Sequence, residues 1–290
     1  MRQMSENKAQ KLVLVTGGAG FIGSHLCECL VKNGHKVISL DNYFTGSRNN
    51  HVKGVEYREG HTKDINRHVK EDVDVLYHLG EYSRVEVSLA EPDLVWDFNK
   101  AGTFGVVEYW RKRKCKLVYA GSSTKFGDGG LGRIQSPYAW SKASNTELIE
   151  NYSRWYGLPY AVTYFYNVYG PRERSGKYGT VIEIFKQKIL KGEVLTVNAP
   201  GSQKRNFTHV NDIVEGILLV GEKGDGDEFG LGAKESYSIL EIANMFGGKV
   251  EMRPEVAGNR MDSELDSFKA EFIGWRPKIK LIDYIREVIK

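Results

Sequence analysis

The chain has 290 residues, which is enough to bury a large hydrophobic core and to form two lobes. Its 41 lysines and arginines nearly balance its 37 aspartates and glutamates, so the formal net charge is only +4. This balance argues against a nucleic-acid-binding protein, for which a strongly basic surface is expected. No apolar run approaches membrane-spanning length, and residues 1–10 are too polar for a signal peptide. We therefore expect a flexible tail there and no membrane partner.

The cysteines give no sign of a disulfide framework or a metal site. Cys27, Cys29 and Cys115 are an odd number, and their spacing is not that of a metal site. We interpret them as reduced thiols and expect a cytoplasmic protein without a bound metal. The one dense basic run, at 110–116, falls where a helix is predicted to end, and cations complement the helix dipole there.

Strands and helices are predicted to alternate through the first half of the chain. Apolar, β-branched runs predict strands near 12–15, 36–40, 54–57, 73–77, 117–121 and 160–165. Apolar residues at helical spacing predict helices near 21–33, 88–112 and 137–156. This succession is typical of an α/β protein with a Rossmann-type, doubly wound parallel sheet.

The pattern loosens after residue 170. Helices predicted near 179–191, 210–221, 238–247 and 281–289 alternate with short strands and glycine-rich turns. We interpret 11–170 as the larger domain and 171–290 as a smaller α/β lobe that caps the carboxyl edge of the sheet. No Pro- or Ser-rich linker separates the two, so we expect one shared cleft and some crossing of the chain between them.

A glycine-rich turn follows the first predicted strand. Gly17, Gly20 and Gly23 are spaced three residues apart between that strand and the helix predicted near 21–33. In a dinucleotide-binding fold the first glycine permits a tight turn, the second lets a pyrophosphate approach the backbone, and the third lets helix pack on strand. The N-terminal amides of the helix would then face the phosphates.

An acidic residue ends the second predicted strand. Asp41 lies about 20 residues beyond the glycines, where an acid accepts the ribose hydroxyls of a dinucleotide. A carboxylate at this place repels a 2′-phosphate, so the pattern predicts NAD rather than NADP. We therefore interpret 11–170 as an NAD-binding domain.

Tyr138 and Lys142 are the residues most indicative of chemistry. They lie four residues apart in a predicted helix and so share one face. An ammonium beside a phenol favours the phenolate, which makes a tyrosine usable as a base near neutral pH. The pair alone is a weak signal, and the glycine-rich turn at the other end of the domain strengthens it.

Taken together, these motifs resemble the NAD-dependent epimerase/dehydratase family of extended short-chain dehydrogenases, which act on nucleotide sugars. The resemblance covers nearly the whole chain from about Lys11 onward. The segments that carry it occur in the family's order: Gly17 to Leu26, Asp41-Asn42, His78-Leu79, Ser122, Tyr138-x-x-x-Lys142, Asn167 to Arg172 and Arg205 to Asp212.

The resemblance implies a role for each matched residue. Tyr138 would be the general base that removes a proton from a sugar hydroxyl as hydride passes to NAD. Lys142 would favour the phenolate and hydrogen-bond the nicotinamide ribose, and Ser122 would hydrogen-bond the same sugar hydroxyl. Alternatively, Ser122 could simply cap the loop that follows it.

Further residues are implied in binding. The cofactor set is Gly17, Gly20, Phe21, Ile22, Gly23, Asp41, Asn42, Leu79, Tyr138 and Lys142. The substrate set is Ser122, Ser123, Thr124, Tyr138, Asn167, Arg205 and Arg260, in which the two arginines would bind the diphosphate.

The residues after Ser122 favour an epimerase within the family. Relatives that dehydrate the sugar usually carry an Asp-Glu pair there, and relatives that decarboxylate a uronic acid usually keep the glutamate. Ser123 and Thr124 occupy those positions here, and neither can act as a carboxylic acid. We therefore expect C4 epimerisation of a UDP-hexose or UDP-N-acetylhexosamine through a transient 4-keto sugar.

Several alternatives stay open at this point. Glu81 and Glu86 could supply a carboxylate from another loop, which keeps a 4,6-dehydratase or another epimerase possible; otherwise both lie in a solvated loop. A dehydrogenase that releases the keto sugar and a non-catalytic NAD-binding sensor or scaffold are further alternatives. A polysaccharide pathway follows only by analogy with the family.

Two smaller expectations concern the surroundings of the site. Lys125 stands where the family has a small or β-branched residue, and it could add charge near a phosphate or carboxylate on the sugar. The family commonly forms homodimers through the helices predicted here near 88–112 and 137–156. Leu148, Ile149 and Tyr152 could serve such an interface or the core.

Overall fold

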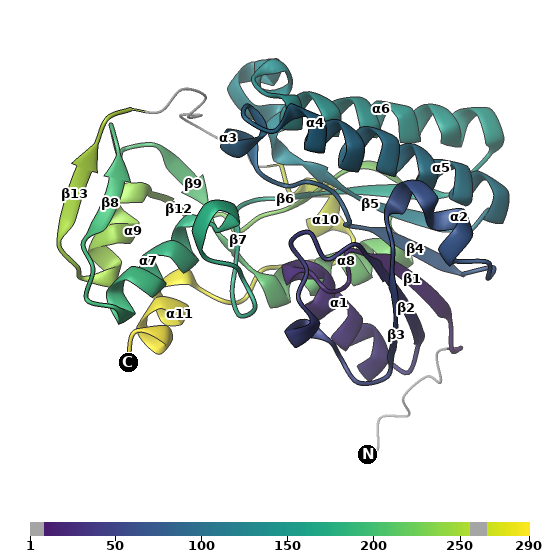
Figure 1. Ribbon diagram of the computed structural model, residues 1–290, viewed down its shortest axis with the longest axis horizontal. Helices are drawn as coiled ribbons and strands as arrows, with labels where there is room; N and C mark the ends of the chain where they lie inside the picture. Colours follow the sequence, from purple (N-terminus) through teal and green to yellow (C-terminus); the bar gives the residue numbers. More distant parts are fainter. Residues whose placement is uncertain (1–8, 256–265) are drawn as a thin grey trace.

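Figure 1 shows a larger lobe built on a twisted sheet and a smaller lobe beside it. The protein is described by a computed structural model that places residues 9–255 and 266–290. The described part of the chain begins in the larger lobe and ends in the smaller one (Figure 1).

The larger lobe contains a seven-stranded parallel sheet. Its strand order is β11-β6-β5-β4-β1-β2-β3, which is the doubly wound order with one strand added. The strands are β1 (Leu12–Thr16), β2 (Lys36–Asp41), β3 (Val55–Glu59), β4 (Val75–His78), β5 (Lys116–Ser122), β6 (Tyr160–Phe165) and β11 (Gly226–Leu231). The predicted fold class is therefore confirmed, and the order reverses between β1 and β4, where ligands bind in such sheets.

Helices cover both faces of this sheet, as an all-parallel sheet requires. The helices α1 (Phe21–Lys32) and α8 (Val210–Lys223) pack on one face through residues such as Leu26 and Ile217. The helices α2 (Ile65–His68), α5 (Gly102–Arg113) and α6 (Pro137–Tyr156) pack on the other, with Trp110 and Ile149 in that core. Ile149 and Tyr152 are thus core residues of the subunit itself.

The helix predicted near 88–112 is divided into several pieces. These are α3 (Val85–Ser88), α4 (Pro92–Val95), a π-helical segment η3 (Trp96–Ala101) and α5. Pro92 occupies the first turn of α4, where its missing N–H costs nothing, so a new helix begins there. The π-helical segment then continues directly into α5.

The smaller lobe has a core of its own. Its strands pair in twos: β7 (Val168–Tyr169) with β10 (Thr208–His209), β8 (Leu195–Asn198) with β13 (Val250–Arg253), and β9 (Lys204–Asn206) with β12 (Ser236–Ser238). Its helices are α7 (Val181–Leu190), α9 (Ile239–Phe246) and α11 (Leu281–Val288). Phe185, Phe246 and Ile285 are central to the core between them.

The chain crosses between the lobes after residue 170. Helix α8 and strand β11 return to the larger sheet, and so does α10 (Phe268–Phe272), which packs with the core beneath α1 and α8. The indole of Trp275 donates to the carbonyl of Asp212 in α8 at 2.8 Å. These three elements follow residue 170 in the sequence and pack with the larger lobe.

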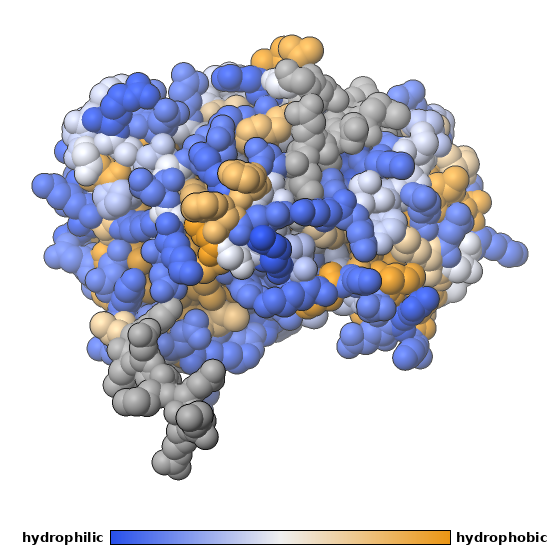
Figure 2. All heavy atoms as spheres, turned by 180° about the vertical axis from the view of Figure 1, so that it is seen from behind, coloured by the Kyte–Doolittle hydropathy of each residue, from blue (hydrophilic) through white to orange (hydrophobic). Residues whose placement is uncertain are grey.

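The remaining described elements are short 3-10 helices: η1 (Arg48–Asn50), η2 (Thr62–Asp64), η4 (Ser123–Ile134) and η5 (Gly176–Tyr178). Across the described residues, none of the helices has both the length and the apolar character that crossing a membrane requires. Seen from behind, the surface is mainly hydrophilic, and its apolar areas are interrupted by hydrophilic residues (Figure 2).

Candidate active site

A cleft of about 480 Å³ lies at the carboxyl edge of the large sheet and takes residues from both lobes. Every predicted site residue within the described part of the chain lines it. These are Gly17, Gly20, Phe21, Ile22, Gly23, Asp41, Asn42, Leu79, Ser122, Ser123, Thr124, Tyr138, Lys142, Asn167 and Arg205. Arg260, the other predicted phosphate ligand, lies outside the described residues. The structure thus brings together residues that are up to 188 positions apart in the sequence, from Gly17 to Arg205.

The glycine-rich turn has the shape that a dinucleotide needs. Gly17 has a φ of +75°, and a Cβ at Gly23 would lie 2.1 Å from the Gly17 oxygen, so neither position admits a side chain. Gly20 caps α1, and the cap makes no side-chain hydrogen bond; the first turn also has no acidic residue. The helix therefore leaves its N-terminal amides and positive dipole end for an anion, which fits the pyrophosphate of a dinucleotide.

Asp41 ends β2 at the same edge. Its carboxylate accepts hydrogen bonds from the backbone N–H of Ala19 at 2.9 Å and of Tyr43 at 2.8 Å. Burial raises the pKa of Asp41, and these two bonds oppose the rise. The glycine-rich turn and the acid are therefore held to each other, which fits a ribose placed next to the pyrophosphate.

Tyr138 and Lys142 come from the start of α6. The Ser136 hydroxyl caps this helix by accepting from the Ala139 N–H at 3.1 Å, and Pro137 occupies the first turn. Only 9% of Tyr138 and 5% of Lys142 is exposed, and both line the cleft. The helix face predicted from their spacing is therefore the face that meets the cleft.

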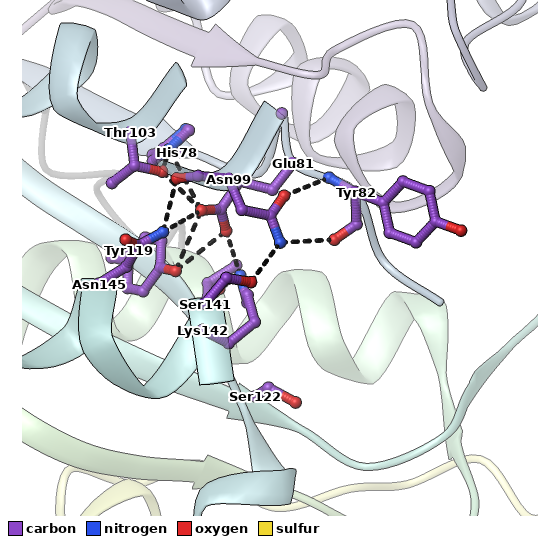
Figure 3. A network of polar contacts seen from close by, with 12 residues as sticks. His78, Glu81, Tyr82, Asn99, Thr103, Tyr119, Ser122, Ser141, Lys142 and Asn145 are labelled. Atoms are coloured by element: carbon purple, nitrogen blue, oxygen red, sulfur yellow. Dashed lines mark hydrogen bonds and ion pairs between the residues drawn. The ribbon is translucent and has the colours of Figure 1, made fainter. Parts of the chain in front are cut away.

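The Lys142 ammonium is anchored from beneath the cleft floor. It donates hydrogen bonds to the Glu81 carboxylate and to the Ala120 carbonyl, and it lies 4.5 Å from the centre of the Tyr119 ring. Figure 3 shows Glu81 between the lysine and residues of three other elements.

Glu81 fits neither of the two interpretations that the sequence analysis considered, which were a carboxylate available to the reaction and a residue of a solvated loop. Its side chain is 3% exposed, so it is not in a solvated loop, and its carboxylate is already bound by protein donors. These donors are Lys142, Thr103 at 2.5 Å, Tyr119 at 3.0 Å and Asn145 at 2.9 Å. Burial alone would raise the pKa of Glu81, but the Lys142 ammonium and the hydrogen bonds hold it below its usual value.

His78 continues this network toward the glycine-rich turn. Its ring nitrogens lie 2.7 Å from the Thr16 hydroxyl and 2.9 Å from the Thr103 hydroxyl. Complete burial lowers the pKa of His78 to about 4, so the ring is neutral at physiological pH. One nitrogen then donates and the other accepts.

Ser122 has the capping contacts that the sequence analysis named as an alternative. Its hydroxyl accepts from the Thr124 N–H at 3.3 Å and lies 3.0 Å from the Thr124 hydroxyl, so it caps η4. It also lines the cleft, and a hydroxyl can accept and donate at once. Capping and a contact with a substrate hydroxyl are therefore compatible.

The smaller lobe and the loop after Glu81 form the opposite side of the cleft. Arg84 is partly buried and donates to the carbonyls of Tyr178 at 2.6 Å and Ser83 at 3.0 Å. The Asn167 amide donates to the Asn206 carbonyl at 3.0 Å, and Arg205 lines the cleft from β9. Burial lowers the pKa of Arg84, which lies near Glu173 and Tyr138.

Glu173 is a cleft residue that the sequence analysis missed. One carboxylate oxygen accepts from the Thr180 hydroxyl and from the Thr180 N–H at 3.2 Å. The other is buried and has no hydrogen-bond partner among the described residues. Burial raises the pKa of Glu173 to about 7. Its place after the matched Arg172 carried no chemical signal in the sequence.

The expectation that Lys125 adds charge to the sugar site is wrong. Its ammonium pairs with Asp227 of β11 at 2.6 Å and lies 3.2 Å from the Tyr164 hydroxyl. Tyr164 in turn donates to the same carboxylate at 2.6 Å. Lys125 therefore connects η4 to the edge strand of the sheet rather than to the cleft.

Comparison with known proteins agrees with this geometry. The model of the NAD dependent epimerase/dehydratase family matches residues 13–232. The chain belongs to this family. A Methanocaldococcus jannaschii protein with the provisional name UDP-glucose 4-epimerase is 32% identical, with 96% of this chain and 97% of that protein covered. UDP-glucuronic acid decarboxylase 6 of Arabidopsis thaliana is 30% identical, with 93% and 85% covered.

Solved structures of family members have the same fold. UDP-glucose 4-epimerase from Thermotoga maritima, solved with UDP-glucose, superposes with a TM-score of 0.88 at 28% identity, covering 96% of this chain and 97% of that one. The Thermus thermophilus enzyme, solved with NAD, has a TM-score of 0.87 at 30% identity and the same coverage. The cofactor of this NAD-dependent family member is therefore NAD.

Proposed function

We propose that the protein is a nucleotide-sugar 4-epimerase that acts on a UDP-hexose or UDP-N-acetylhexosamine. The observation that carries this proposal is the combination of Tyr138, Lys142 and Ser122 in one cleft with a dinucleotide-binding turn. Ser123 and Thr124 follow Ser122 along the cleft wall and offer no carboxylic acid. Tyrosine, lysine, serine and cofactor suffice for oxidation, rotation of a 4-keto sugar and reduction from its other face.

Each residue would have one task in this reaction. Tyr138 would take the proton of the sugar 4-hydroxyl and return it after the sugar has turned. Lys142 would hold the phenol in its reactive form by placing a positive charge beside it. Ser122 would orient the same hydroxyl. Bound NAD would supply the acceptor for the hydride.

The remaining polar residues of the cleft would bind the substrate. Arg205 would bind the diphosphate, since a guanidinium fork matches phosphate oxygens. Asn167 would contact the sugar-phosphate region next to it. Gly17, Gly20, Gly23 and Asp41 would hold the cofactor on the opposite side of the cleft. The hydrogen bond from the Ala19 N–H to Asp41 supports this role, because it joins the acid to the glycine-rich turn.

A product assay tests the proposal. Purified protein with NAD would be given UDP-, GDP-, dTDP- and CDP-linked hexoses, N-acetylhexosamines and uronic acids, and each product would be examined by mass and proton NMR. We expect a product of unchanged mass whose sugar coupling pattern is altered at C4. A product that lacks one water or one carbon dioxide would overturn the epimerase assignment.

One observation favours a second candidate, a dehydratase. Glu173 lines the cleft with a pKa raised to about 7, so it can donate a proton at physiological pH. Glu86, at the start of α3, lines the same cleft and offers a second carboxylate. The pair would protonate a leaving hydroxyl and accept a carbon-bound proton, and the mass of the product decides between the candidates.

A third candidate from another class is a non-catalytic NAD-binding sensor or scaffold. The presence of Tyr138, Lys142 and Ser122 in the cleft argues against it, because a protein that only binds NAD has no use for a base. Absence of turnover with every nucleotide sugar in the panel, together with tight NAD binding, would favour the sensor.

We also propose a homodimer that forms through α5 and α6. Trp96 and Trp140 stack with ring centres 6.0 Å apart, yet they are 59% and 44% exposed, and Phe104 on α5 is 53% exposed. Large exposed aromatic side chains are enriched at protein interfaces. Sedimentation should give twice the chain mass, and Trp140→Glu should give the monomer.

A further inference from the structure

Glu81 is a buried carboxylate that forms an ion pair with the Lys142 ammonium. We propose that Glu81 is a positioning residue that fixes the Lys142 ammonium from below and sets the pH range in which Tyr138 works as a base. The inference rests on the proposed roles of Tyr138 and Lys142, and it concerns a carboxylate that already accepts hydrogen bonds from four protein donors.

The hydrogen bonds of Lys142 support the positioning role. An ammonium has three N–H donors. Glu81 and the Ala120 carbonyl accept two of them at the floor of the cleft, and Lys142 also lines the cleft. The third donor is therefore directed toward the cleft, where a ribose or a phenol can accept it. Without Glu81, the Lys142 ammonium would keep only one of these two acceptors, the Ala120 carbonyl.

The loop that carries Glu81 is itself held rigidly. The Asn99 amide accepts from the Tyr82 N–H at 2.7 Å and donates to the Tyr82 carbonyl at 3.2 Å, so it fixes the next residue of the loop (Figure 3). The Thr103 hydroxyl donates to Glu81, so it accepts from His78, whose other nitrogen accepts from Thr16. Thr16 directly precedes Gly17. The network thus joins the lysine to the cofactor-binding turn.

The charges around Glu81 support the electrostatic role. The titratable and charged groups that face it are Lys142 on α6, Tyr119 on β5, His78 on β4 and Lys100 on η3. His78 and Tyr119 are uncharged at physiological pH. Glu81 is therefore the buried negative charge in contact with Lys142, and the two charges compensate each other.

The charge of Glu81 predicts the direction in which its removal shifts the pH dependence of the rate. Replacing Glu81 by glutamine removes the negative charge that contacts Lys142, one helical turn from Tyr138. The phenolate is then stabilised and the ammonium is destabilised, so both groups lose their protons at lower pH. Both limbs of a bell-shaped pH–rate profile should move the same way, toward acid, by about 1 pH unit.

The experiment compares the protein with Glu81→Gln and with the control Glu71→Gln. Glu71 accepts from Arg58 at 2.7 Å and lies outside the cleft, so its variant loses an ion pair without changing the charge near Tyr138. The pH dependence of kcat/KM would be measured with NAD and the substrate from the product assay. We expect both limbs to shift in Glu81→Gln only. A lower kcat with unmoved limbs would reduce Glu81 to a structural role and overturn the proposal.

A second readout needs neither substrate nor cofactor. The ultraviolet absorbance of tyrosinate would be titrated in the protein and in Glu81→Gln, each corrected by its own Tyr138→Phe counterpart. The Tyr138 signal should develop at lower pH in Glu81→Gln. If the wild-type protein turns over no nucleotide sugar, the proposed function fails while this titration still decides the role of Glu81.

A further variant covers the case in which Glu81→Gln does not fold. Glu81→Asp keeps the charge and withdraws it from Lys142 by one methylene group, so the limbs and the tyrosinate titration should move in the same direction by less. An Asp variant that folds and titrates like wild type would also overturn the proposal.

Discussion

Two glutamates at opposite sides of the same cleft have opposite environments. Glu81, beneath the cofactor side, accepts from four donors, one of them an ammonium, and its pKa is lowered despite complete burial. Glu173, on the substrate side, has one carboxylate oxygen without a hydrogen-bond partner in the described part of the chain, and its pKa is raised to about 7. Burial alone therefore fixes neither the charge nor the role of a carboxyl group.

The cleft therefore has two walls that differ in how fully their polar groups are paired within the protein. On the cofactor side the charges are paired before any ligand arrives, which keeps Lys142 in place. On the substrate side one carboxylate oxygen of Glu173 has no hydrogen-bond partner among the described residues, so a sugar hydroxyl can still bind to it.

Tyr138→Phe should have the largest effect, because it removes the proposed general base from the cleft. We expect kcat/KM to fall by about 10²–10⁴-fold, as for the loss of a general base, while NAD and sugar binding persist. Steady-state turnover and calorimetric binding would measure the two separately. Retained turnover would mean that Tyr138 is not the base of the reaction.

Asp41→Asn should weaken the cofactor wall alone. The amide keeps the size of the side chain but loses the charge that favours ribose hydroxyls over a 2′-phosphate. We expect NAD affinity to fall about tenfold, which is about 1.4 kcal/mol of binding free energy. The preference for NAD over NADP should become smaller. Calorimetry with both dinucleotides would check this, and an equal loss for both would contradict the charge argument.

Glu173→Gln should have the smallest effect, and it sharpens the comparison on the substrate side. The folded protein holds this proton up to about pH 7, whereas the unfolded chain releases it near pH 4.5. The contribution of Glu173 to stability is therefore present below pH 4.5 and is lost as the pH rises toward 7. Relative to the glutamine variant, the free energy of unfolding should fall by on the order of 1 kcal/mol across that window.

Urea unfolding at several pH values would measure this difference. A constant offset between the protein and Glu173→Gln from pH 4.5 to 7 would show that the Glu173 carboxyl titrates normally, and the contrast with Glu81 would then disappear.

The sequence predicted the sheet well because its signals are local. Val13 to Val15, Ile38 and the glycines at 17, 20 and 23 each indicate their own conformation through hydrophobicity or through the absence of a side chain. The helix predicted near 88–112 failed for a local reason too, because Pro92 starts a new helix and the periodicity alone did not reveal it.

The electrostatics of the site could not be predicted in the same way. Glu81 stands in a polar stretch, and the residues that bury it, Thr103, Tyr119 and Asn145, come from distant elements. The charge of Glu173 likewise depends on its burial in the folded chain, which raises its pKa against the hydrogen bonds from Thr180. Motifs therefore located the cleft, and only the folded chain revealed which carboxylates are paired within it.

The returning strand β11 has a consequence for how this chain can be divided. It pairs with β6, and α10 and Trp275 pack behind it against α8, so the larger lobe is completed only by residues that follow most of the smaller one. A fragment that ends at residue 170 would leave the backbone of β6 unpaired along one side, an edge prone to self-association. Neither lobe is therefore an independent module for exchange or recombination, and cofactor and substrate specificity are expected to evolve together within one folding unit.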